Sequence, residues 1–358
     1  MITAYGPTLG RAQLRSEPED FRVVEELGFV PSGSGEHYLL QVRKRGWTTP
    51  AVARLLAERC GVPSRQVAYA GLKDRHAETT QWLSLQLPGQ DLPLTPGPLA
   101  EGVELLAIER NARKLRHAAL RANRFALTLR AVDAPRRAVE RRLYAIAQRG
   151  IPNYFGPQRF GRSGDNFEQA RAWLLAGAPV RDRTLRGLLL SAVRSELFNR
   201  VLARRVVAGT WDLLLPGERA MLDGRGSHFA VAELDAALER RLRRGELHPS
   251  GPLAGQSDPA DAPAAGVAAL EQAVLAEEAD MVAALQRRGL RAERRALRVM
   301  PRQLCWHWPA TDRLVLCFAL PPGAYATTLI AELFDTESVP VHQAASAEGS
   351  GTLCGGAQ

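Results

Sequence analysis

Residues 70–82 read AGLKDRHAETTQW, a short polar stretch between two apolar segments. Before it, Val67, Tyr69 and Gly71 alternate with alanines; after it, Leu83, Leu85 and Leu87 alternate with Ser84 and Gln86. Alternation with a period of two predicts a β-strand on each side. The stretch is therefore expected to be a loop carried by a sheet, where binding and catalytic groups are often located.

Within this loop, Asp74 lies between Lys73 and Arg75. Cationic neighbours favour the ionised form of a carboxylate, so Asp74 is a candidate nucleophile or metal ligand. The same two cations are suited to holding a phosphodiester. The alternative is a solvated turn whose charges only keep it soluble, and a Lys-Asp-Arg triplet by itself favours that interpretation.

Size and composition predict a globular protein with a polyanionic partner. The 358 residues are enough for two domains, and 46% hydrophobic with 24% charged residues is typical of soluble chains. Lysine and arginine outnumber aspartate and glutamate by 47 to 38, which gives a net charge of +9. This excess favours nucleic-acid binding, although an arginine-rich background composition would produce it too.

The sequence offers no membrane, metal or disulfide signal. No segment approaches the roughly 20 apolar residues needed to cross a bilayer, and residues 1–7 do not resemble a signal peptide, so we expect a cytoplasmic protein. Cys60, Cys305, Cys317 and Cys354 are scattered and form no C-x-x-C pair. We therefore expect neither a zinc site nor a disulfide framework.

The N-terminal third has the element order of an α+β protein. Residues 21–26 and 38–44 have strand patterns joined by a glycine-rich connection, which predicts a β-hairpin. A helix is expected from Pro50, with Thr49 as its N-cap and Gly61 after its end. A strand, the Asp74 loop and another strand follow, so the predicted class is α+β.

Two further stretches are candidates for contact with RNA. Residues 110–117 are densely basic and precede a predicted strand in which Asn123 and Phe125 offer an amide and a ring to a base. A run of charges is also typical of a solvated face. Residues 151–161 form a tight loop, interpreted either as an interdomain hinge and RNA-facing wall or as a structural turn with packed rings.

The pattern changes after this loop and changes back near the end of the chain. Residues 149–299 are mostly helical and arginine-rich, with a predicted loop over 248–266 and one long helix over 267–285. Strand patterns return at 304–308 and 314–320 and are expected to rejoin the first sheet. We therefore predict one domain from residues 1–148 and 300–335, an insertion at 149–299, and a flexible tail at 336–358.

The loop sequence carries a family resemblance. Gly-Leu-Lys-Asp-Arg-His-Ala-x-Thr-x-Gln-Trp, at residues 71–82, closely resembles the active-site motif of the D family of tRNA pseudouridine synthases (TruD), and NYFGPQRFG at 153–161 resembles a second motif of that family. Further blocks match in the same order over nearly the whole chain, at residues 18–21, 35–37, 123–125, 194–199 and 320–327.

This resemblance implies a catalytic α+β domain with a mostly antiparallel mixed sheet and an inserted α/β TRUD domain, which together form a cleft for tRNA. The implied activity is isomerisation of uridine 13 in the tRNA D arm to pseudouridine, with no cofactor or metal. Asp74 would be the nucleophile, with Lys73 and Arg75 supporting it. Arg15 stands where the family usually has a lysine paired with that aspartate.

The resemblance also implies that Phe21, Asn123, Phe125 and Tyr325 line the uridine pocket. Tyr325 departs from the phenylalanine that is common in the family; ring stacking would survive, but the hydroxyl needs a partner. A ring-lined pocket suits the chemistry, because the target nucleotide must leave its stack and meet a nucleophile away from water.

Two alternatives remain at this point. A non-catalytic tRNA-binding or RNA-folding protein could use the same basic surface. Another carboxylate enzyme, such as a glycoside hydrolase, usually needs two carboxylates, and Glu78 is the only second acid close to Asp74 in the sequence. We expect a monomer. Whether the carboxylate attacks the sugar or the base is left open.

Overall fold

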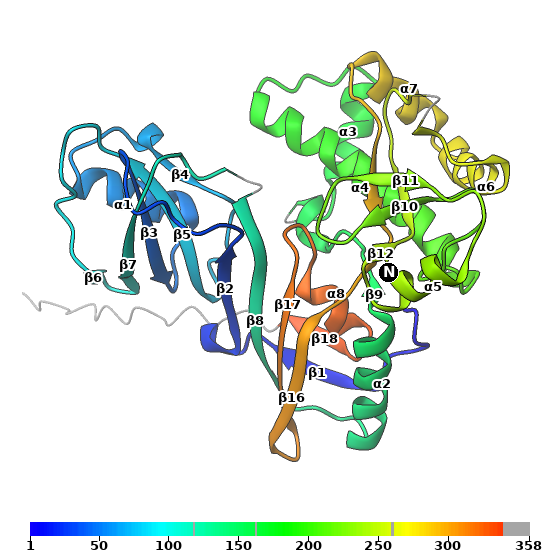
Figure 1. The fold of residues 1–358 in the computed structure, drawn as a ribbon, viewed down its shortest axis with the longest axis horizontal. Helices are drawn as coiled ribbons and strands as arrows, with labels where there is room; N and C mark the ends of the chain where they lie inside the picture. Colours follow the sequence, from blue (N-terminus) through cyan, green and yellow to red (C-terminus); the bar gives the residue numbers. More distant parts are fainter. Residues whose placement is uncertain (117–118, 162, 259–260, 339–358) are drawn as a thin grey trace, which may run out of the picture.

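The computed structural model describes residues 1–116, 119–161, 163–258 and 261–338. Its largest feature is an eleven-stranded sheet whose main path runs β16-β17-β8-β2-β5-β3-β7-β6, with β4 paired to β5 and β1 paired to β8 and β18 (Figure 1). The β1–β18 and β2–β5 pairs are parallel, whereas the other pairs of this sheet are antiparallel. The predicted α+β class with a mostly antiparallel mixed sheet is confirmed. The strands are β1 (Arg11–Leu14), β2 (Phe21–Leu27), β3 (His37–Lys44), β4 (Val67–Tyr69), β5 (Glu78–Gln86), β6 (Gly97–Ala100), β7 (Val103–Asn111), β8 (Leu120–Arg130), β16 (Arg302–Ala310), β17 (Arg313–Leu320) and β18 (Asp335–Ser338).

Helices cover this sheet at two places and create two apolar cores. Helix α1 (Thr49–Arg59) packs Val52 and Leu56 against strands β3 and β5. Helices α2 (Arg136–Arg149) and α8 (Ala326–Ala331) bury their apolar side chains against β8 and β17. The N-cap of α1 is Thr48, whose hydroxyl accepts the Ala51 N–H, so the prediction of Thr49 was off by one residue.

The predicted hairpin between residues 21–26 and 38–44 is wrong. Both segments are strands, but β5 lies between them, parallel to β2 and antiparallel to β3. Strand β5 is buried on both faces along most of its length, and such a strand is stable only in the interior of a sheet. The glycine-rich connection instead packs against residues 110–112 and 119 at its two ends.

One short antiparallel ladder, separate from the large sheet, joins the two ends of the middle part of the chain. Strands β9 (Ile151–Pro152) and β15 (Arg298–Val299) pair antiparallel, with Ile151 opposite Val299. The segment between them occupies the upper right of Figure 1, away from the strands β3 to β7. The predicted division into domains stays a prediction. The elements of this middle region are α3 (Asn166–Leu174), α4 (Arg183–Val207), β10 (Arg219–Leu222), β11 (His228–Ala230), α5 (Ala236–Arg243), β12 (Leu247–His248), β13 (Ser250–Leu253), α6 (Ala265–Ala276), α7 (Ala279–Arg287) and β14 (Glu293–Ala296).

Two expectations for the middle region need correction. The single helix predicted over 267–285 is broken into α6 (Ala265–Ala276) and α7 (Ala279–Arg287). Glu278, at the break, binds the guanidinium groups of Arg171 and Arg200 at 2.8 and 2.9 Å. The predicted loop 248–266 contains β13, which pairs with β14. Gly251 of β13 pairs with Arg295, and glycine suits the position because a Cβ there would lie 2.9 Å from Leu297 and 3.3 Å from Phe198.

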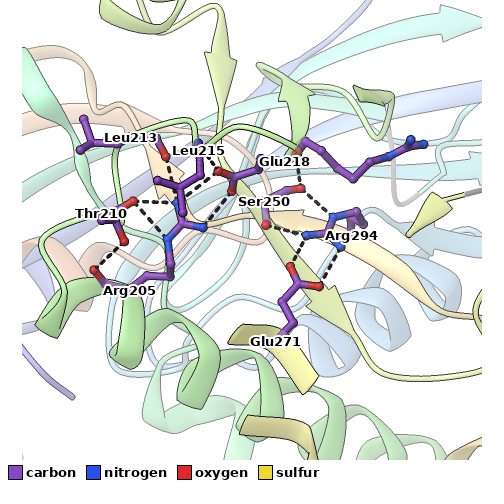
Figure 2. A network of polar contacts seen from close by, with 9 residues as sticks. Arg205, Thr210, Leu213, Leu215, Glu218, Ser250, Glu271 and Arg294 are labelled. Atoms are coloured by element: carbon purple, nitrogen blue, oxygen red, sulfur yellow. Dashed lines mark hydrogen bonds and ion pairs between the residues drawn. The ribbon is translucent and has the colours of Figure 1, made fainter. Parts of the chain in front are cut away.

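Two buried ion pairs lie side by side in the interior of this region (Figure 2). The guanidinium group of Arg205 binds the Glu218 carboxylate at 3.0 Å, and both side chains are at most 1% exposed. Arg294 binds Glu271 and also donates to Ser250. We refer to Arg205, Glu218, Ser250, Glu271 and Arg294 as the charge network. Its backbone partners include the carbonyls of Thr210, Leu213, Arg219 and Ser250 and the N–H of Leu215.

The C-terminal segment also differs from expectation. Residues 336–338 were predicted to begin a flexible tail, but they belong to β18, which pairs with β1 from Arg11 opposite Asp335 to Leu14 opposite Ser338. The rest of the predicted tail, residues 339–358 with Cys354, lies outside the described residues, as does His117 of the basic stretch. In the described part of the chain, no helix has the length and apolar character that a bilayer span requires.

Candidate active site

A buried lysine holds the backbone of the loop between β4 and β5 in place. Lys44, at the end of β3, is fully buried, and its Nζ donates to the carbonyl oxygens of Trp47 at 2.7 Å and Asp74 at 2.9 Å. Burial lowers the pKa of Lys44 to about 8, although the nearby Asp74 carboxylate opposes the shift. The Thr49 hydroxyl accepts the Lys73 N–H at 3.0 Å and donates to Gln81 at 2.8 Å. These contacts fix the backbone on which Asp74 stands.

Both oxygens of the Asp74 carboxylate have a partner. Oδ1 accepts the His76 N–H at 3.0 Å, and Oδ2 lies 3.1 Å from Nη1 of Arg15. The Asp74 side chain is 27% exposed, so it is neither sealed in the core nor free in solvent. The Arg15 guanidinium also lies 4.2 Å above the Phe21 ring.

Arg15 has an unusual backbone conformation. Its φ is +66°, in the left-handed region that non-glycine residues rarely adopt and that costs conformational energy. It directly follows β1, so this conformation turns the chain at the end of the strand. Arg15 Nε is buried and has no hydrogen-bond partner among the described residues.

The side chains of Lys73 and Arg75, the two sequence neighbours of Asp74, bind other groups. Lys73 Nζ lies 2.5 Å from Glu25 Oε1, and Glu25 is fully buried on β2. Arg75 Nε donates to the Gly46 carbonyl at 2.9 Å. The cation that pairs with the Asp74 carboxylate is therefore Arg15. Lys73 and Arg75 bind Glu25 and the Gly46 carbonyl instead.

Most of the predicted residues surround one cavity of about 260 Å³. It is at the small end of ligand pockets, which begin at roughly 300 Å³. The Phe21 and Phe125 rings meet edge to face at 6.2 Å, and Phe125 stacks on Phe318 at 5.3 Å. Arg75 lies outside the lining. The predicted residues that line the cavity are Arg15, Phe21, Lys73, Asp74, Asn123, Phe125 and Tyr325.

Asn123, on β8, carries an unused acceptor. Its Oδ1 atom is buried and has no hydrogen-bond partner among the described residues, and the side chain lines the cavity. A buried acceptor without a partner costs free energy, so it is a natural place for a donor of a bound molecule. The cavity thus combines a carboxylate, aromatic rings and a free acceptor.

The middle region reaches the same cavity through Gln158 of the 153–161 loop, which also packs on Tyr325. A Cβ on Gly156 would lie 3.0 Å from the Tyr325 ring, so glycine allows this ring to pack closely on the 153–161 loop. Arg295 joins the two segments: it donates to Gly323 O at 2.8 Å and to Asn153 Oδ1 at 2.7 Å and lies 4.0 Å from the centre of the Phe155 ring. Burial lowers the pKa of Arg295 to about 10.

The comparisons with known proteins agree with one another. The family model for tRNA pseudouridine synthase D (TruD) matches residues 3–176 and 176–333. A protein of Nitrosococcus oceani named tRNA pseudouridine synthase D is 49% identical over 341 residues, which is 94% of each chain. Proteins of the same name from Xanthomonas euvesicatoria and Pseudomonas fluorescens are 46% and 45% identical over at least 93% of each chain. The chain belongs to the TruD family.

Membership in this family makes the chain a pseudouridine synthase, which is an isomerase. A solved TruD structure from Methanosarcina mazei has the same fold, with a TM-score of 0.68 at 21% identity over 93% of this chain and 96% of the other. Within the described residues of this TruD chain, no group of three or more His, Cys, Asp or Glu side chains is arranged to hold a metal ion.

Sequence reasoning missed several residues that shape the site. Glu25 and Lys44 are charged, but each continues an inward-facing series, after Phe21 and Val23 in β2 and after Leu40 and Val42 in β3. Strand alternation could have placed both of them inside the TruD fold. Thr49 and Arg295 come from other segments, and no local signal marked them as part of the site. Gln158, which lines the cavity, lies in the 151–161 loop, for which an RNA-facing wall was one of the two interpretations.

Proposed function

We propose that this chain converts a uridine of tRNA, uridine 13 of the D arm, to pseudouridine, with Asp74 as the nucleophile. The observation that carries this proposal is the Asp74 carboxylate, paired with Arg15 at 3.1 Å, in the lining of a cavity that also contains Phe21, Asn123 and Phe125. Family membership and the names of the relatives supply the reaction class and the RNA.

The reaction rearranges bonds within one nucleotide. The N1–C1′ bond breaks, the uracil turns, a C5–C1′ bond forms, and the proton at C5 is released while N1 gains one. The carboxylate assists by forming a temporary bond to the nucleotide, at C1′ of the sugar or at C6 of the base. Both routes need Asp74 within reach of a base that has left its stack.

The rest of the lining suits a flipped uracil. The rings of Phe21, Phe125 and Tyr325 offer faces and edges for stacking, which is how proteins commonly hold single bases. The free Oδ1 of Asn123 would accept a hydrogen bond from N3–H of uracil. Arg15 would hold the carboxylate in place, with Lys73 and Arg75 supporting the loop from the Glu25 and Gly46 sides.

We also propose that residues 149–299 form an inserted TRUD domain and that residues 1–148 and 300–335 form the catalytic domain, with 336–338 as its last strand. The β9–β15 ladder at the point of entry and exit supports this division. The contacts of Arg295 with Asn153 and Gly323 support a cavity shared by the two domains.

The decisive experiment uses tRNA whose uridines carry tritium at C5. Asp74→Asn should abolish tritium release while the affinity for tRNA stays within about threefold, because only the nucleophile is lost. Asp91→Asn, at an exposed carboxylate, is the matched control and should react like wild type. Turnover by Asp74→Asn would remove Asp74 from this role. Tight binding without turnover by the wild type would favour an RNA-binding protein.

The target position is tested separately. Pseudouridine in tRNA should be mapped in cells with and without this gene, and the modification at position 13 should disappear in its absence. If position 13 keeps its pseudouridine and another site loses it, the assignment of the D arm is wrong, although the synthase chemistry would stand.

A further inference from the structure

One residue of the Asp74 loop is exposed where a buried residue is expected. Leu72 lines the cavity, two residues before Asp74, yet its side chain is 71% exposed. Of the large apolar side chains that are exposed in the described part of the chain, Leu72 alone belongs to this lining. Single exposed leucines are common on protein surfaces, so exposure alone indicates no ligand. Leu72 is distinguished by its position in the lining of the cavity, two residues before Asp74, where a bound nucleic acid would cover it.

The backbone that follows Leu72 is fixed. On its C-terminal side, the Lys73 N–H donates to Thr49, the Lys73 ammonium is paired with buried Glu25, and Lys44 holds the Asp74 carbonyl. The Lys73 side chain is therefore turned inward while Leu72 faces outward. A large apolar side chain on a fixed backbone loses little conformational entropy when it enters a binding partner.

We propose that Leu72 is the wedge that enters the RNA stack at the place the target nucleotide has left, a proposal that rests on the proposed function. A nucleotide that turns out of its stack leaves an apolar gap between two bases, and proteins that open stacks often fill such gaps with leucine or a similar side chain. Leu72 has no polar atom in its side chain, so it would read no sequence and only hold the gap open.

The spacing along the chain fits this role. Two residues span at most about 7 Å, and stacked bases of one strand follow one another at about 3.4 Å. Leu72 in the gap would therefore place Asp74 within about two base steps, on the side to which the nucleotide has moved. The wedge and the nucleophile would then be parts of one preformed loop.

The test compares rates on folded and unfolded RNA for the full-length chain. Leu72→Ala should slow single-turnover pseudouridine formation in folded tRNA by about 10- to 100-fold, because the opened stack is no longer held. On a short unstructured oligoribonucleotide with the same target sequence, it should change the rate by less than about threefold, because little stacking is lost there. Leu72→Met should restore most of the rate on folded tRNA.

The control variant is Val30→Ala. Val30 is 90% exposed and lies outside the cavity lining, so its truncation removes exposed apolar surface without touching the proposed wedge. Both alanine variants should melt at the wild-type temperature. An adenine analogue such as 2-aminopurine beside the target in tRNA reports the opening directly: its fluorescence should rise when Asp74→Asn binds and should rise much less with Asp74→Asn/Leu72→Ala.

The outcomes separate the two proposals. If Leu72→Ala reacts like wild type on folded tRNA, or if it slows both RNAs equally, Leu72 is not a wedge, whatever the function. If the wild type forms no pseudouridine in either RNA, the proposed function fails. A fluorescence rise that depends on Leu72 would then still support an opened stack.

Discussion

Buried charges serve different ends in two regions of this molecule. In the charge network of the middle region, the guanidinium and carboxylate groups of Arg205, Glu218, Glu271 and Arg294 are bound to one another, to Ser250 or to backbone groups (Figure 2). Around the Asp74 cavity, by contrast, Arg15 Nε and Asn123 Oδ1 are buried without a partner among the described residues. The network is complete without a ligand, whereas the cavity is not.

This difference indicates which substitutions should act on stability and which on catalysis. In a closed network every charged group is already paired, so none is free to bind a substrate. Removing one partner leaves a buried charge unpaired and should therefore destabilise the fold. Buried polar atoms without a partner destabilise the free protein, and hydrogen bonds to a bound nucleotide can offset that loss. Substitutions near the cavity should therefore change turnover more than stability.

The largest effect is expected at the closed network. Arg205→Met should lower the free energy of unfolding by about 3–5 kcal/mol, because Glu218 is left buried without its cation. Burial already raises the pKa of Glu218 against the opposing effect of Arg205. The measurement is urea unfolding, with tritium release at low temperature to show that the folded fraction still turns over at the wild-type rate.

The adjacent Arg204 provides the control for this prediction. Its side chain is 67% exposed and pairs with Glu277 at 3.3 Å, so Arg204→Met should change stability by no more than about 0.5 kcal/mol. If Arg205→Met were as stable as Arg204→Met but inactive, the network would be part of the site, and the contrast between the two regions would be wrong.

The accuracy of the sequence predictions follows the range of the interactions involved. Local patterns predicted the strands that carry Phe21, Asn123 and Phe125, because strand alternation is a local property. That these three residues share one pocket was implied by the family resemblance and not by alternation. The position of β5 between β2 and β3 depends on pairings between distant segments, and no local pattern predicts it.

Side-chain partners in the loop were even less accessible from sequence. Asp74 was expected beside Lys73 and Arg75, but the backbone of this loop is set by Thr49 and Lys44, which lie about 25 to 30 residues earlier. Glu278, at the break between α6 and α7, likewise binds arginines that come from α3 and α4. A periodic apolar pattern continues through such a break and cannot reveal it.

An intermediate effect is expected at Lys44, the fully buried cation under the loop. Lys44→Met removes the donor to the Trp47 and Asp74 carbonyls, and each buried acceptor left unpaired costs about 1–3 kcal/mol. Part of this cost should appear as a displaced Asp74 and a rate of tritium release reduced about 10- to 100-fold. Arg54→Met, at an exposed cation of α1, is the control and should leave the rate unchanged.

The pH dependence of stability tests the environment of Lys44 independently. Its pKa is about 8 in the folded chain and near 10.5 when exposed, so between these values the unfolded chain holds a proton that the folded chain has released. The unfolded chain then binds more protons, and stability rises with pH. Compared with Lys44→Met, the wild type should gain up to about 3 kcal/mol of stability from pH 8 to pH 10.5 and lose the same amount as the pH falls from 10.5 to 8. A difference that is constant over this range would show that Lys44 is not desolvated.

The smallest effect is expected at Tyr325, where the two regions meet. Its ring packs on Gly156 and meets Phe155 at 6.4 Å, and Tyr325→Phe keeps both contacts. If the cavity requires only the ring, the free energy of unfolding should change by no more than about 0.5 kcal/mol, as for a neutral substitution. The single-turnover rate should then stay close to that of the wild type. Tyr325→Leu is the matched comparison, because it keeps apolar bulk but removes the aromatic face, and it should slow the reaction about tenfold, in line with 1–3 kcal/mol for stacking on a base. A large loss in Tyr325→Phe would instead assign the hydroxyl a partner in the bound RNA. The cavity would then offer a polar group, not only a ring face, on the side where Tyr325 packs against the middle region.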